Sequence, residues 1–124
     1  MTVSERERAR ETANALAALL KRGLMIARSN PYYGGMGLAY IEGTFIYAPV
    51  NDGYVFSPSE AKICGEVDYR IEFAGEQAFV DWLEEFLVSP TARGPMNDLD
   101  ANRIEEAVRI YKKSDGQDLT GFRH

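Results

Sequence analysis

The chain has 124 residues, of which 45% are hydrophobic and 11% aromatic, with one cysteine and a formal net charge of −5. This length and composition predict one globular domain, residues 1–124, and argue against disorder and against a disulfide framework. No apolar run is long enough to cross a bilayer and the first residues lack a signal-peptide pattern, so we expect a cytoplasmic protein.

Charge is unevenly distributed along the chain. Residues 31–100 carry twelve acidic and three basic side chains, whereas residues 1–30 have a net charge of +3 and residues 101–124 of +1. An acidic central region disfavours binding to nucleic acid or to a membrane surface, and it favours a basic protein partner. Solubility alone is the other explanation of the same charge.

The first predicted element is a long amphipathic helix over residues 4–28, in which Gly23 is a candidate for a bend or a break. A Ser4-x-x-Glu7 capping box begins it, and Asn30-Pro31 ends it, because a proline disfavours helical geometry in the residue before it. The segment Tyr32–Gly37 follows, with two tyrosines and three glycines. This composition indicates either a recognition loop or a plain connector between helix and strand.

The middle of the chain predicts an antiparallel sheet. Residues 38–50 form one extended run with a bend at Gly43. Asn51-Asp52-Gly53 is a hairpin turn signal, and residues 54–56 are the expected return strand.

A second turn is predicted at residues 57–60, and residues 61–64 fit either a short strand or one helical turn. In residues 67–73, apolar and charged side chains alternate, which is the pattern of a strand with one buried face. The expected buried face is Val67, Tyr69, Ile71 and Phe73, and the expected exposed face is Asp68, Arg70 and Glu72.

Residues 76–88 form the next predicted helix, with Trp82 in its apolar stripe. Residues 98–114 predict a last helix, and residues 115–124 a loose tail. Together these elements predict an α+β fold: a three- to four-stranded antiparallel sheet with a long N-terminal helix and two C-terminal helices packed mainly on one face.

Residue types suited to catalysis or metal binding are scarce. The sole histidine is the terminal His124, which excludes Ser-His and Cys-His mechanisms, and Cys64 is expected to be structural. One cysteine and one histidine also exclude zinc, and residues 98–109 lack the glycine and the final glutamate of a calcium loop. The pairs Glu84-Glu85 and Glu105-Glu106 are expected on solvated helix faces. We therefore expect no catalytic residue, no metal site and no cofactor.

One stretch resembles a known class of protein. Phe73 to Leu83, FAGEQAFVDWL, is a strand ending in Phe followed by a helix with F-V-D-W-L, and it resembles the strand-to-helix step of some small bacterial immunity proteins. These proteins neutralise toxins of contact-dependent, type VI and related polymorphic systems. The resemblance implies a short, acidic, cytoplasmic α+β protein that binds a toxin and has no catalytic residues.

The expected function is a non-enzymatic inhibitor that binds a basic toxin domain, such as a nuclease, and occludes its active site. Carboxylates near the sheet would pair with the toxin's Lys and Arg, and tyrosines would add buried contact area. The residues expected to contribute are Tyr32, Tyr33, Glu42, Asp52, Glu60, Glu66 and Asp68.

Two alternatives belong to other classes. One is a small-molecule-binding or enzymatic domain, with a pocket between sheet and helices that is lined by Tyr40, Tyr47 and Tyr54 and gated by the Tyr32–Gly37 loop. The other is a structural subunit whose exposed helix stripe pairs with a second copy or with another chain.

Overall fold

The computed structural model describes residues 3–28, 36–49, 55–65, 70–88 and 101–111. It is an α+β fold, as the sequence predicted. The elements follow in the order α1 (Val3–Lys21), β1 (Ile26–Arg28), β2 (Met36–Ile41), β3 (Thr44–Pro49), α2 (Pro58–Cys64), β4 (Ile71–Glu72), α3 (Glu76–Val88) and α4 (Ala101–Tyr111).

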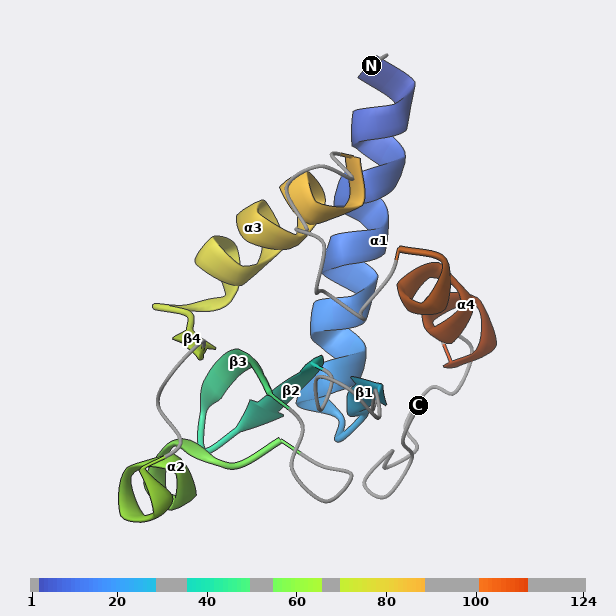
Figure 1. The fold of residues 1–124 in the computed structure, drawn as a ribbon. Helices are drawn as coiled ribbons and strands as arrows, with labels where there is room; N and C mark the ends of the chain where they lie inside the picture. The colour runs from blue at the N-terminus through green and yellow to red at the C-terminus, as the bar shows by residue number, and fades with distance from the viewer. Residues whose placement is uncertain (1–2, 29–35, 50–54, 66–69, 89–100, 112–124) are drawn as a thin grey trace.

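The four strands form one antiparallel sheet in the order β1-β2-β3-β4. Leu38 of β2 lies opposite both Ile26 of β1 and Tyr47 of β3, so these three side chains share one face. Helices α1, α3 and α4 pack over that face, whereas α2 lies at the opposite end of the molecule from the start of α1 (Figure 1).

The main core fills the space between this face and the three helices. Phe45 of β3 stacks on Phe79 of α3 with ring centroids 4.6 Å apart, and Tyr47 packs against Trp82 at 4.9 Å. Further fully buried members are Ala13, Leu16, Ala17, Leu20, Leu24, Leu38, Leu83 and Ile104. The second face of the sheet carries a smaller cluster of Ala39, Ile46, Ala48 and Val55.

Helix α1 ends seven residues before the predicted end at residue 28. Gly23 has a φ of 108°, and its N–H donates to the Leu20 carbonyl while the Leu24 N–H donates to the Leu19 carbonyl. This is the Schellman arrangement, in which a residue of positive φ ends a helix. Leu24 remains in the core, but the chain continues as strand β1.

The predicted single strand over residues 38–50 is a hairpin of two strands. Glu42 and Gly43 form its turn with φ values of 54° and 74°, so both adopt the left-handed conformation of a two-residue hairpin turn. Glycine adopts this conformation easily, whereas glutamate rarely does.

Residues 58–64 form helix α2. For residues 61–64 the sequence was consistent with a short strand or with one helical turn, and the structure has the helix. The predicted turn at residues 57–60 is therefore the start of a helix. Residues 55–57 belong to no strand, so the described part of the predicted return strand is not formed.

Strand β4 is shorter than predicted, and the burial of its side chains differs from the expected pattern, although Ile71 lies opposite Tyr47 and so on the predicted face. Ile71 is 38% exposed, whereas the side chain of Arg70 is only 4% exposed. The buried guanidinium donates hydrogen bonds to Glu72 and to the backbone carbonyl of Phe56, and burial of a charged group requires such partners.

Helix α3 has the predicted bounds, and α4 lies inside the predicted range of 98–114. Ile104, Ala107 and Val108 are buried as the stripe of α4 predicted. The turn at residues 51–53 and the tail at 115–124 lie outside the described residues. No helix in the described part of the chain has the length and apolarity that crossing a membrane requires.

Candidate functional site

The candidate site is the end of the molecule formed by α2, the β2–β3 turn and β4. Its local structure begins with a capping box at the start of α2. The Glu60 N–H donates to Ser57 Oγ (3.2 Å), and the Ser57 N–H donates back to Glu60 Oε1 (3.0 Å). Pro58 occupies the first turn, where its missing N–H costs nothing, and Gly65 ends the helix with a φ of 74°.

Glu42 joins the β2–β3 turn to this helix. Its Oε1 accepts hydrogen bonds from both the hydroxyl of Ser59 (2.9 Å) and the backbone N–H of Ser59 (3.1 Å). These bonds, first the one from the hydroxyl and then the one from the amide, hold the pKa of Glu42 below its ordinary value because they stabilise the charged form. The turn and α2 are thus connected by one carboxylate.

Arg70 connects β4 to the segment before α2. Its Nε donates to Glu72 Oε2 (2.6 Å), and its Nη2 donates to the backbone carbonyl of Phe56 (2.8 Å). The guanidinium therefore lies between the strand and residue 56 instead of on the solvated face that the sequence predicted. Its positive charge also contributes to the lowered pKa of Glu42.

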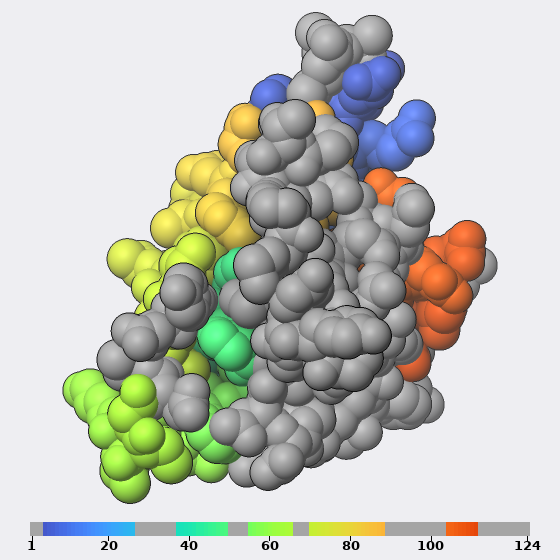
Figure 2. All heavy atoms as spheres, in the orientation of Figure 1, coloured from blue at the N-terminus to red at the C-terminus, as the bar shows by residue number. Residues whose placement is uncertain are grey.

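Ile63 gives this end an apolar group. Its side chain is 86% exposed, the highest value among the large exposed hydrophobic residues of the described chain. Residues three and four apart on a helix are neighbours, so Ile63 lies beside Glu60 and Ser59, and Ser59 is the residue that contacts Glu42. Figure 2 shows α2 (green) at one end of the molecular surface, on the opposite side from α4 (orange).

Of the seven residues predicted to bind a partner, Glu42 and Glu60 lie within the described residues. The structure brings both to the start of α2, where each also has a structural partner. The other five, which are Tyr32, Tyr33, Asp52, Glu66 and Asp68, lie outside the described residues.

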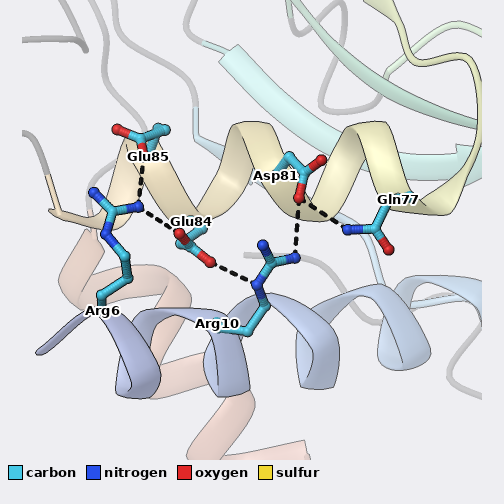
Figure 3. Close-up of polar contacts among 6 residues, drawn as sticks. All are labelled: Arg6, Arg10, Gln77, Asp81, Glu84 and Glu85. Atoms are coloured by element: carbon cyan, nitrogen blue, oxygen red, sulfur yellow. Dashed lines mark hydrogen bonds and ion pairs between the residues drawn. The ribbon is translucent and has the colours of Figure 1, made fainter. Parts of the chain in front are cut away.

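A second charged cluster lies between α1 and α3 (Figure 3). Arg6 Nη1 contacts Glu84 Oε2 and lies 2.6 Å from Glu85 Oε1. Arg10 contacts Glu84 through Nε (2.6 Å) and Asp81 through Nη1 (3.0 Å). The hydrogen bonds to Glu85 and Glu84 raise the pKa of Arg6.

The burial of Glu84 contradicts one prediction from the sequence. Glu84 was expected on a solvated helix face, but it is 7% exposed and lies between two arginines of α1. Its neighbour Glu85 is exposed, as predicted. We name these five residues, Arg6, Arg10, Asp81, Glu84 and Glu85, the α1–α3 ion-pair cluster.

An open hollow of about 560 Å³ lies beside this cluster, lined by Arg6, Glu7, Arg10, Glu11 and Glu84. Both arginines that line it are already paired with α3 carboxylates, so neither is a free cation for a ligand. Among the described residues, no group of three or more His, Cys, Asp or Glu is placed to hold a metal ion.

Two features of the α2 end were missed at the sequence level. The capping box had a visible signal, Ser57-x-x-Glu60 with a proline between, which is typical of a helix start. The exposure of Ile63 had no such signal in the sequence, because an isoleucine in a short apolar run is equally consistent with a buried strand.

Comparison of the chain with protein-family models, with curated protein sequences and with solved structures found no match.

Proposed function

We propose that this chain is a non-enzymatic inhibitor of the immunity-protein kind, which binds a basic protein toxin and covers its active site. The observation that carries the proposal is Ile63, which α2 holds almost fully exposed beside Glu60 and one helical turn from Ser59, the residue that Glu42 contacts. A protein interface commonly has an apolar anchor at its centre and charged groups around it.

Charge complementarity identifies the kind of partner. The α2 end carries the exposed carboxylates Glu42 and Glu60 and one exposed lysine, Lys62, while Glu72 is paired with Arg70. Glu66 and Asp68 follow α2 directly in the chain. Carboxylates around an apolar anchor match the lysines and arginines of a nuclease surface, and they accelerate association with it.

The aromatic core supports surface binding over the small-molecule alternative. Tyr47 is buried against Trp82, and Tyr40 packs against the core and the ring of Phe45. These two tyrosines therefore fill the space between sheet and helices that the alternative assigned to a pocket.

The test is to express the product of the neighbouring reading frame alone and together with this chain. We expect toxicity when it is expressed alone, rescue by this chain, and a purified complex in which the toxin's activity is blocked. A toxic neighbour that this chain neither rescues nor binds, or a neighbour that is not toxic, contradicts the proposal.

A further inference from the structure

Among the described residues, few side chains attach helix α2 to the rest of the fold. All seven of its residues are described: Ala61 is buried, Pro58 is half-buried and the other five are exposed. No α2 side chain belongs to either of the two core clusters formed by the described residues. Hydrophobic burial, which fixes α1 and α3, therefore contributes little to the position of α2 within the described part of the chain.

Glu42 supplies the contact that burial does not. Its carboxylate receives two hydrogen bonds from Ser59, which lies 17 residues further along the chain. Its φ of 54° is one that Asn, Asp or Gly would adopt more easily in a hairpin turn. Local turn preference thus does not explain a glutamate here, whereas its reach to Ser59 does.

We propose that Glu42 is a latch that fixes α2 to the β2–β3 turn, and that α2 detaches as a unit, with the α1–α3–sheet core intact, when this contact is lost. The inference stands apart from the proposed function, because it concerns contacts within the chain and needs no partner.

The first test is amide hydrogen exchange of Glu42→Gly measured by NMR. Glycine suits the conformation of the turn, so this variant removes the latch and keeps the hairpin favourable. The amides of Ala61 and Gly65, which donate to Ser57 and Ala61 within α2, should exchange about tenfold faster. The amides of α1, α3 and the β2–β3 ladder should keep their protection.

Two further variants separate the latch from a general effect of charge. Glu42→Gln keeps an acceptor oxygen without the charge, so its α2 amides should exchange at an intermediate rate. Glu105→Ala removes an exposed carboxylate from α4 and should leave the exchange of α2 unchanged.

The second test uses Cys64, the single cysteine of the chain, which is exposed at the end of α2. A nitroxide label on Cys64 should show a larger mobile component in its electron paramagnetic resonance spectrum in Glu42→Gly than in the wild type. The latch is contradicted by unchanged α2 exchange and label mobility in Glu42→Gly. Equal acceleration of α2, α1 and α3 amides also contradicts it, because α2 would then not open as a separate unit.

Discussion

At the scale of single residues, Glu42 combines an unfavourable backbone conformation with a favourable side-chain contact. The left-handed φ disfavours glutamate, and the two hydrogen bonds from Ser59 favour it. A residue in this position affects both the turn that contains it and the helix that it contacts. A substitution at Glu42 therefore has to be interpreted from both elements.

The lowered pKa of Glu42 predicts how α2 responds to acid. Its ordinary value is 4.5, and its value in the folded chain is lower. Its contribution to the attachment of α2 is therefore fully present above pH 4.5 and is lost as pH falls through the folded pKa. Ser57, Ser59 and Arg70 are the other groups that influence this carboxylate.

The measurement is amide exchange of α2 between about pH 6 and about pH 3, corrected for the intrinsic exchange rate. In the wild type, the protection of α2 should fall with pH before that of α1. In Glu42→Gln the protection of α2 should start lower and change less. A wild-type profile identical to that of Glu42→Gln would show that this carboxylate has no such effect.

At the scale of elements, the contact between α1 and α3 has two parts, an apolar face and the α1–α3 ion-pair cluster. Leu16 and Leu20 of α1 and Phe79 and Leu83 of α3 share the core, and the arginines of α1 continue the contact toward the start of the helix. The buried member of the cluster is Glu84, and it contacts both arginines.

Glu84→Gln should lower the free energy of unfolding by about 1–2 kcal/mol, because two hydrogen bonds between charged groups lose their negative partner at a buried position. Glu85→Gln is the matched control, because this neighbouring carboxylate is exposed, and it should cost less than about 0.5 kcal/mol. Urea unfolding followed by tryptophan fluorescence measures both values. Equal losses in the two variants would show that burial of Glu84 does not matter.

The elements that periodicity defines were predicted well. The apolar stripe of α3 predicted the first and last residues of that helix, and the apolar stripe of α4 predicted which of its residues are buried. Gly23 indicated a bend or a break in the first helix, and the structure has a break there. The helix was nevertheless expected to continue to residue 28, because Leu24 and Met25 keep the helical pattern.

The hairpin turn and the site were harder to predict, since their determinants lie far apart in the chain. Glu42-Gly43 is a poor turn sequence unless Ser59 is near, and no local pattern contains that contact. The same holds for Arg70, whose inward position depends on the carbonyl of Phe56.

At the scale of the whole molecule, the uneven charge of the sequence is partly paired by the fold. Arg6, Arg10 and Lys21 of the basic first helix pair with carboxylates of α3, namely Glu76, Asp81, Glu84 and Glu85. At the α2 end, Glu42 and Glu60 instead accept hydrogen bonds from neutral groups of the chain, and neither forms an ion pair among the described residues.

Charge reversal at Glu66 and Asp68, which follow α2 in the chain, tests whether this end attracts the proposed partner. We expect Glu66→Lys with Asp68→Lys to weaken binding to the neighbouring gene product about tenfold at low salt, mainly through slower association. The difference should shrink at about 0.5 M salt, because screening suppresses long-range attraction. Surface plasmon resonance at two salt concentrations measures the affinity and the association rate at each. Unchanged binding at low salt would remove these two residues from the interface.

The most direct test of the proposed partner-binding surface is the affinity of Ile63→Asp for the neighbouring gene product, measured by isothermal titration calorimetry. Ile110→Asp is the matched control, because Ile110 is 50% exposed on α4, at the other side of the molecule. Ile63→Asp should raise Kd by about tenfold or more with an unchanged melting temperature, and Ile110→Asp should leave Kd within about twofold. Wild-type affinity in Ile63→Asp, or an equal loss in both variants, would contradict binding through α2.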